Sequence, residues 1–533
     1  MNLILLKVFN KLKKYLYIFF EVVNIFDNKV FYDLDNIFKI KKIEYENIIL
    51  FDHFASPNHQ LIRSLLLNSL SKHYEGNLVC FNYTISPFLK KLYKIINVKN
   101  LIQNDYVEKK FNINFNINKI YKEELKKISS KKKLMNYHFK GYHVGIDIYE
   151  SYLRNYNKAT IDLHDFKLKN LLHTAIKRIF FWENYFIKNN VKAISISHRN
   201  YLDTNLICKI GYKKKIPVFT FGGTGKRIGR FYGAELDSHK YLKNYYNDLS
   251  NKEKKLGVNI AKKQIKKRFN GVIGINMSYS TKSAFIKFDK SKKALKINNR
   301  IKVLICTNCF YDNPHAYGGN LFTDFYEWLI FLGKISHKTN YEWYIKPHPD
   351  YLPGTLEHIK KINKNFKNIE LINPSTSFHQ LAQEGIKIAL TTYGSIAHEL
   401  PLLGIDVINA DIYNPHSSFD FSHTPKNLKE YKKLLMNLGN LESKIKNKND
   451  IFKFYYIHHY FMNGKHSIIS SVDKNFEKNY QLNYRIFYNY FIKSMKSKDI
   501  LKVHSKLFNF FKSNFKYFLE KKKQIIINKY EKY

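Results

Sequence analysis

Short apolar runs alternate with amphipathic segments of helical period through the second half of the chain. Each run is three to five residues long and is followed by polar or turn-forming residues. Such regular alternation predicts strands and helices in turn, which is typical of a doubly wound parallel sheet. The predicted strands are Lys302–Ile305, Trp343–Ile345, Ile369–Ile372, Ile388–Leu390 and Asp406–Asn409.

The first half of the chain contains two similar units. The apolar run Asn47–Phe51 precedes a helical segment, Gln60–His73, and a second run, Leu78–Phe81. A strand, a helix and a second strand in this order predict a parallel pair with a right-handed crossover. The run Ala193–Ser197, a helix to Tyr212 and the run Pro217–Phe221 repeat the pattern.

The chain has 533 residues, which is too long for one hydrophobic core. We therefore expect an α/β protein with two doubly wound Rossmann-like domains and helical additions at both ends. The expected divisions are an amphipathic helical segment (1–45), an N-terminal Rossmann-like domain (46–235), a helical connection (236–300), a C-terminal Rossmann-like domain (301–445) and a basic helical segment (446–533).

Two polar loops follow predicted strands of the second domain. The first is Lys346-Pro347-His348-Pro349-Asp350, where two prolines end the strand. The second is Thr391–Ser395, which follows Ile388–Leu390. Ligands of open α/β sheets bind at the carboxyl ends of the strands. The two loops therefore predict the walls of one anion-binding cleft.

The chain is strongly basic, with 90 Lys and Arg against 43 Asp and Glu and a net charge of +47. This charge favours anionic partners such as phosphorylated substrates, anionic lipid or nucleic acid. A coding bias that spreads Lys over the whole surface is the alternative explanation. No nucleic-acid-binding motif is present and the basic residues are not gathered in a stripe, so we expect no nucleic-acid partner.

No apolar run reaches the length of a membrane-spanning helix. The segment Met1–Val30 mixes apolar residues with lysines, and the tail Phe508–Tyr533 is basic. We expect a cytoplasmic protein held peripherally on the inner face of the membrane. A first helix packed on its own domain is the alternative. The four cysteines form no disulfide framework, and Cys306–Cys309 fits a strand end.

The KPHP sequence resembles the HP motif of bacterial sialyltransferases, polysialyltransferases and capsular Kdo transferases, which use CMP-sugars. The Thr391-Thr392 pair, with Ser395 close by, resembles the Ser/Thr element that meets the nucleotide phosphate in those families. The longer string from Cys309 to Ile408 resembles bacterial capsule and surface-polysaccharide biosynthesis proteins. The resemblance covers roughly residues 300 to 430 well and is weaker around residues 141 to 230.

This resemblance implies a GT-B glycosyltransferase with an N-terminal acceptor domain and a C-terminal donor domain. The implied activity is transfer of a sugar from a nucleotide-sugar to a glycan or lipid-linked acceptor of a capsular or surface polysaccharide. A catalytically inactive scaffold on the membrane is the alternative, and a nucleic-acid-binding protein is a more distant one. The residues implied to bind the donor phosphate and nucleotide are Lys346, His348, Thr391, Thr392, Ser395 and Glu399.

The general base is not fixed by the resemblance, because the acidic-glycine motif of the sialyltransferase-type families is missing. Side chains at strand ends are the candidates, since a base must reach the acceptor hydroxyl. The catalytic candidates are Asp52, His198 and His315, and further cleft candidates are His53, Gly222, Gly223 and Asp312. We expect no metal and no cofactor, with the nucleotide-sugar as substrate, because the cleft itself supplies groups that neutralise the leaving phosphate.

Overall fold

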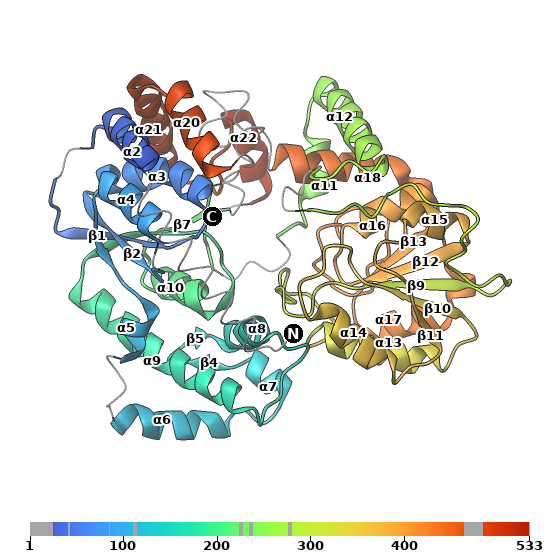
Figure 1. The fold of residues 1–533 in the computed structure, drawn as a ribbon. Coiled ribbons are helices and arrows are strands. Elements are labelled where there is room, and N and C mark those ends of the chain that lie inside the picture. The colour runs from blue at the N-terminus through green and yellow to red at the C-terminus, as the bar shows by residue number, and fades with distance from the viewer. Residues whose placement is uncertain are drawn as a thin grey trace. The chain divides into compact units, whose positions relative to one another are not determined.

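The chain forms two compact α/β units in a computed structural model (Figure 1). The structure describes residues 25–40, 43–84, 86–109, 115–222, 228–233, 238–275, 280–462 and 483–531. Unit 1 draws its residues from Met1–Tyr121, His173–Gly233 and Gly464–Tyr533, and unit 2 from Lys122–Leu172 and Ala234–Asn463. Each unit contains one main parallel sheet, so the predicted pair of doubly wound domains is confirmed.

The sheet of unit 1 has the strand order β3-β2-β1-β6-β7-β8. All neighbours are parallel except β7 and β8. The chain leaves β1 towards β2 and β3 on one side and resumes at β6 on the other, so the strand order reverses between β1 and β6. The strands are β1 (Asn47–Asp52), β2 (Gly76–Phe81), β3 (Val98–Leu101), β6 (Val191–Ile196), β7 (Val218–Phe221) and β8 (Ile228–Arg230).

Helices near both ends of the described chain share one hydrophobic core with this sheet. Ser56 caps the first turn of α3 by accepting a hydrogen bond from the His59 N–H, and Pro57 fits the first helical position. The helices that lie in unit 1 or extend into it are α2 (Ile25–Phe38), α3 (Pro57–His73), α4 (Pro87–Ile95), α5 (Asn104–Lys109), α6 (Phe115–Lys126), α9 (Phe166–Lys188), α10 (Tyr201–Lys213), α20 (Tyr484–Ser494), α21 (Ser497–Lys512) and α22 (Lys521–Tyr530). Of these, α6 and α9 each cross a boundary with unit 2.

The described part of the predicted membrane segment packs on its own unit. Val30, Phe31, Leu34 and Phe38 of α2 are buried in the core together with residues of α20 and α21. The apolar face of α2 is therefore covered by protein. Residues 1–24 of that segment lie outside the described residues. No helix within the described ranges combines the length and the apolar character needed to cross a membrane.

The sheet of unit 2 is wholly parallel, with the order β11-β10-β9-β12-β13. The chain runs outward from β9 through β10 to β11 and then returns to β12 on the other side of β9. The strand order therefore reverses between β9 and β12. The strands are β9 (Lys302–Cys306), β10 (Glu342–Lys346), β11 (Ile369–Leu371), β12 (Ile386–Thr391) and β13 (Asp406–Asn409).

The helical segment that follows the Thr391–Ser395 loop is divided into two parts. It is α-helical to Glu399 and continues as a 3-10 turn, Leu400–Leu403, where Pro401 has no N–H to donate. Gly404 ends the turn at φ 83°, a conformation that favours glycine. The α-helices are α7 (Lys131–Met135), α8 (Gly145–Tyr156), α11 (Leu242–Asn247), α12 (Asn251–Phe269), α13 (Phe325–Ser336), α14 (Thr355–Asn363), α15 (Phe378–Gln383), α16 (Ile396–Glu399), α17 (Leu428–Met436) and α18 (Lys448–Tyr456).

The boundaries of the two units differ from the domain boundaries expected from the sequence. Residues 122–172, expected within the N-terminal domain, belong to unit 2. Tyr149 of α8 donates a hydrogen bond to Asp324, and Glu150 accepts one from the N–H of His315. The expected connection 236–300 also belongs to unit 2, and residues from Gly464 onward belong to unit 1. These long-range contacts leave no local pattern in the sequence.

Unit 1 buries two neutral histidines, which predicts instability in acid. His59 and His504 are both almost fully buried, and each keeps one ring nitrogen without a partner among the described residues. Burial lowers the pKa of His59 to about 3 and that of His504 to about 4. Below about pH 6.5 these two histidines therefore become protonated in the unfolded chain but stay neutral in the folded unit. The free energy of unfolding consequently decreases as the pH falls.

The expected slope is about 3 kcal/mol of unfolding free energy per pH unit for the two histidines together, between about pH 6 and pH 4. Urea unfolding followed by circular dichroism at several pH values measures it. His504→Gln should lower the slope by about 1.4 kcal/mol per pH unit, the contribution of one histidine, while leaving the fold intact. An unchanged slope in this variant would show that other groups govern the acid sensitivity.

Candidate functional site

The two polar loops of unit 2 lie at the same edge of its sheet, on either side of β9. The first follows β10 and the second follows β12, and both strands pair with β9. Two strand spacings separate them, which is about 10 Å. Asn308, which follows β9, donates a hydrogen bond of 2.9 Å to the Thr392 hydroxyl. The second loop also borders the point where the strand order reverses, the usual ligand site of such sheets.

His348 is presented to solvent by a rigid loop between Pro347 and Pro349. Its Nδ1 atom accepts a hydrogen bond of 3.1 Å from the backbone N–H of Asp350. The proton of the neutral ring therefore sits on Nε2, and no described residue accepts a hydrogen bond from it. Asp350 is itself fixed by the N–H and hydroxyl groups of Thr281. His348 can thus donate to an anion from a fixed position.

The pKa of His348 is lowered from its ordinary value. Desolvation by the surrounding protein is the main cause, and the charges of Lys346 and Arg268 add to it, while Asp350 opposes the shift. At neutral pH the ring is therefore an uncharged hydrogen-bond donor.

The sequence predicts that the ammonium group of Lys346 lines the cleft, but this side chain is buried. Only 1% of the residue is exposed. Its Nζ atom donates to the Pro374 carbonyl at 2.8 Å and lies 4.8 Å from the centre of the Phe378 ring. Burial lowers its pKa to about 8. All five residues of β10 are buried, so Lys346 belongs to the covered part of the sheet, and the exposed His348 comes two residues later.

The second loop is held by the hydroxyls of its two threonines. Thr391 and Thr392 are almost fully buried. The Thr391 hydroxyl accepts from the Gly394 N–H at 3.1 Å, and a Cβ at Gly394 would lie 2.7 Å from that hydroxyl. Ser395 is half-buried, and its side chain makes no capping hydrogen bond. The threonines therefore shape the loop, and the serine hydroxyl is the group with access to a ligand.

Glu399 forms a buried ion pair with Arg268 near the end of α12. The Glu399 side chain is 3% exposed and that of Arg268 is 15% exposed. The guanidinium also lies 5.6 Å from the centre of the Phe285 ring. Arg268 carries no distinct signal in the sequence, because it is one cation within a helix rich in lysine. Arg268 is thus a further cation that its ion pair with Glu399 holds beside α16.

Asp52 lies at the end of β1 in a buried network that joins β1 to β6. Its Oδ1 atom accepts 2.6 Å from Arg63 and 2.8 Å from the N–H of Ser197, and its Oδ2 atom accepts from the Ser197 hydroxyl. Arg63 of α3 also donates to the carbonyls of Asp52 and Ser195. Asp52 is 1% exposed, so its carboxylate fixes neighbouring groups and does not meet solvent.

His198 extends this network to the surface at the end of β6. Its Nδ1 atom lies 3.1 Å from the Ser197 hydroxyl oxygen. The Ser197 hydroxyl has one proton and donates it in a hydrogen bond to Asp52. Its oxygen must therefore accept the hydrogen bond that links it to His198, so the Nδ1 atom of His198 carries a proton. The Nε2 atom of the exposed ring then carries the lone pair. This series of hydrogen bonds, from Asp52 through Ser197 to His198, lies where the strand order of unit 1 reverses.

The other unit 1 candidates surround this network. His53 makes a 2.9 Å hydrogen bond between Nδ1 and the Tyr93 hydroxyl, and burial lowers its pKa to about 4. The Gly222 carbonyl accepts from His59 at 3.3 Å. Gly223 lies outside the described residues. Neither His53 nor Gly222 offers a group as accessible as the His198 ring.

His315 and Asp312 belong to unit 2 and are differently placed. The two ring nitrogens of the buried His315 contact a Glu150 carboxylate oxygen at 3.2 Å and the Thr323 carbonyl at 2.9 Å. Burial opposes protonation, but Glu150 outweighs it and the pKa of His315 is raised. With both nitrogens donating, this ring has no lone pair for a base. Asp312 is exposed and 3.4 Å from Arg154.

Comparison with known proteins gives structural matches only. No protein-family model and no curated protein matches the sequence. Among solved structures, a glycosyltransferase from Rickettsia africae matches with 10% identity and a TM-score of 0.26, over 86% of this chain and 100% of that chain. The UDP-GlcNAc 2-epimerase of Neisseria meningitidis bound to UDP-GlcNAc matches with 11% identity and a TM-score of 0.22, over 76% and 97%.

Anabaena Alr3699/HepE, in complex with UDP and glucose, matches with 8% identity and a TM-score of 0.24, over 88% of this chain and 99% of that chain. At identities and TM-scores this low, neither an activity nor a set of site residues can be transferred from these proteins to this chain. What this chain does must therefore be inferred from its own sequence motifs and from the contacts at its two sheet edges.

Proposed function

We propose that this chain is a glycosyltransferase that moves a sugar from a nucleotide-sugar, with a CMP-sugar favoured, to a growing capsular or surface polysaccharide. The observation that carries the proposal is the His348 ring. It is held by Asp350 so that its Nε2–H faces solvent at the sheet edge that also holds Ser395 and Arg268. A neutral donor, a hydroxyl and a guanidinium form a suitable set for a phosphate.

The proposed role of unit 2 is to stabilise the leaving nucleotide phosphate. As the bond between the anomeric carbon and the phosphate oxygen breaks, negative charge grows on that oxygen. A fixed donor aimed at such charge contributes about 3–4 kcal/mol to the transition state. His348 and Ser395 would donate hydrogen bonds, and Arg268 would supply the positive charge. Glu399 would hold Arg268 in place, and the buried threonines would hold the loop.

The proposed role of unit 1 is to activate the acceptor. His198 would take the proton of the acceptor hydroxyl on Nε2 while the hydroxyl oxygen attacks the anomeric carbon. Ser197 and Asp52 would hold the ring in the required tautomer and stabilise the imidazolium that forms. Asp52 acts through Ser197 and is a positioning residue. We propose that the acceptor is a glycan or a lipid-linked glycan on the inner face of the membrane, to which the +47 charge attracts the protein.

The test is transfer of labelled sugar from CMP-, CDP- and UDP-sugars to a polysaccharide primer in EDTA, with and without anionic vesicles. We expect transfer from one donor class, retained in EDTA because protein groups neutralise the phosphate. Complete loss in EDTA would overturn the metal-independent mechanism. No transfer from any donor class, with or without vesicles, would favour the inactive scaffold.

A further inference from the structure

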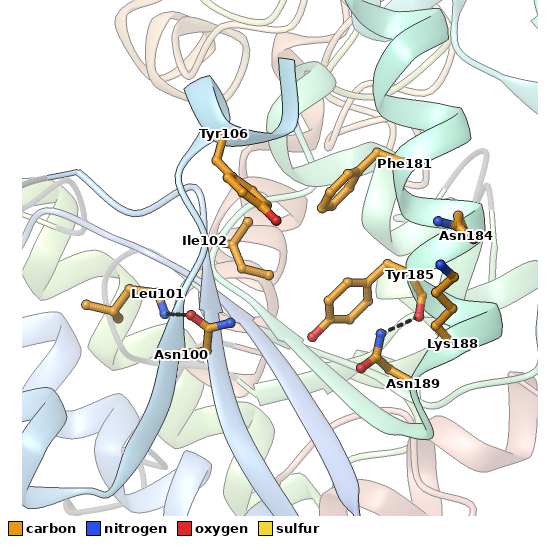
Figure 2. A pocket seen from close by; sticks show the side chains of 9 residues that line it. All are labelled: Asn100, Leu101, Ile102, Tyr106, Phe181, Asn184, Tyr185, Lys188 and Asn189. Carbon is orange, nitrogen blue, oxygen red and sulfur yellow. Dashed lines mark hydrogen bonds between the residues drawn. The ribbon is translucent and has the colours of Figure 1, made fainter. Parts of the chain in front are cut away.

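A cavity of about 400 Å³ lies on unit 1, beside the edge strand β3 and the last turns of α9 (Figure 2). Its volume falls within the range of pockets that hold small ligands. It is separate from the His198 network, because β2 lies between β3 and β1 in the sheet. The lining residues are Asn100, Leu101, Ile102, Tyr106, Phe181, Asn184, Tyr185, Lys188 and Asn189.

Three aromatic rings form one side of this cavity, which we call the β3 pocket. The rings of Tyr106 and Phe181 meet edge to face with centres 6.3 Å apart, and Phe181 lies nearly parallel to Tyr185 with centres 6.2 Å apart. Tyr106 is 55% exposed, whereas Phe181 is buried. Burial raises the pKa of Tyr185 to about 12, so its hydroxyl stays neutral. A rigid aromatic wall that is open to solvent suits the apolar C–H face of a ring-shaped ligand.

Amide side chains complete the lining. Asn189 donates from Nδ2 to the Tyr185 carbonyl at 2.8 Å, which leaves its Oδ1 atom as an acceptor. Asn100 accepts at Oδ1 from the Leu101 N–H at 2.8 Å, which leaves its Nδ2 group as a donor. Figure 2 shows both amides beside the open space. Among the described residues that line the pocket, Lys188 alone carries a formal charge, so they form no cluster of cations for a phosphate.

We propose that the β3 pocket binds a short stretch of an oligosaccharide. A sugar ring presents an apolar C–H face that packs on aromatic rings. Its hydroxyls both donate and accept hydrogen bonds, which matches the free donor of Asn100 and the free acceptor of Asn189. The further identification of that oligosaccharide as the acceptor polysaccharide rests on the proposed function. In that case the pocket holds the growing polymer away from the transfer site and favours long acceptors over short ones.

Titration of the full-length protein with maltotriose, chitotriose and α2,8-linked sialotriose, followed by saturation-transfer NMR and calorimetry, tests the pocket. We expect at least one trisaccharide to bind. Tyr106→Ala and Asn100→Ala should each weaken that binding about tenfold or more, the scale of losing one stacking or hydrogen-bonding partner. Tyr32→Ala is the matched control, because this tyrosine of α2 is also exposed and lies outside the pocket.

Binding that Tyr106→Ala and Asn100→Ala leave unchanged, or no binding of any of the three sugars, would overturn the proposal. Sugar transfer measured on the same variants separates the two claims. Oligosaccharide binding lost in the variants, without any transferase activity in the wild type, would support the pocket and contradict the enzyme. Transfer to long acceptors that is unaffected by Tyr106→Ala would contradict the role of the pocket while leaving the enzyme in place.

Discussion

Replacing His198 with alanine is expected to lower kcat/KM for sugar transfer by about 10²- to 10⁴-fold, the usual contribution of a general base. The ring is exposed, so the loss should come without unfolding of unit 1. Circular dichroism and urea unfolding check the fold, and initial rates at a subsaturating donor concentration measure the effect. His164→Ala, which changes another exposed histidine, is the matched control.

The pH profile gives the sharper test of the same role. Desolvation by the protein groups around the ring and the charge of Arg63 lower the pKa of His198, and Asp52 opposes that shift. A base must be deprotonated, so activity should fall as the pH falls through the lowered pKa, below about 6.5. Above that value the ring is neutral and activity should be level. In His198→Ala the acid limb should vanish. An acid limb that survives in this variant would assign the base to another group.

Ser197→Ala separates positioning from catalysis. It leaves the His198 ring but removes the acceptor of its Nδ1–H, so the required tautomer is no longer enforced. We expect a loss of about tenfold, smaller than for His198→Ala, and a changed tautomer ratio in ¹⁵N NMR of the ring. A wild-type tautomer ratio in Ser197→Ala would show that the serine does not position the histidine.

Replacing His348 with alanine is expected to lower kcat by about 10²- to 10³-fold, because one fixed donor to the leaving phosphate is lost. The loop carries little of the core, so unfolding free energy should change by less than about 1 kcal/mol. His337→Ala, in which an exposed histidine at the end of α13 is removed, should keep full activity. A fully active His348→Ala enzyme would contradict the donor site. Loss of activity in both variants would indicate a general structural effect.

The sequence predicted the strands and the loops well because both leave local signals. Apolar runs mark β9, β10 and β12, and the prolines of the KPHP motif mark the end of β10. The short edge strand β3 was missed, because its residues Val98–Leu101 are half polar and partly exposed. A strand with one neighbour needs less apolar surface than a central strand, so its pattern is weaker.

Side-chain directions and long-range partners could not be predicted in the same way. Lys346 stands one residue before the loop, and only the strand pairing shows that it turns into the core. Arg268 is about 80 residues from the KPHP loop in sequence and becomes a candidate only through its ion pair with Glu399. Asp52 and His198 were separate candidates in the sequence, and the structure links them through hydrogen bonds to Ser197. Each of these contacts links residues that are distant in the chain or depends on a single rotamer.

A crystal structure of the protein with CMP, with CDP and UDP as parallel soaks, would locate the nucleotide. We expect its phosphate within hydrogen-bonding distance of His348 Nε2 and the Ser395 hydroxyl, with the Arg268 guanidinium beside it. A nucleotide bound away from the carboxyl ends of β10 and β12, or His348 turned away from the bound phosphate, would contradict this expectation.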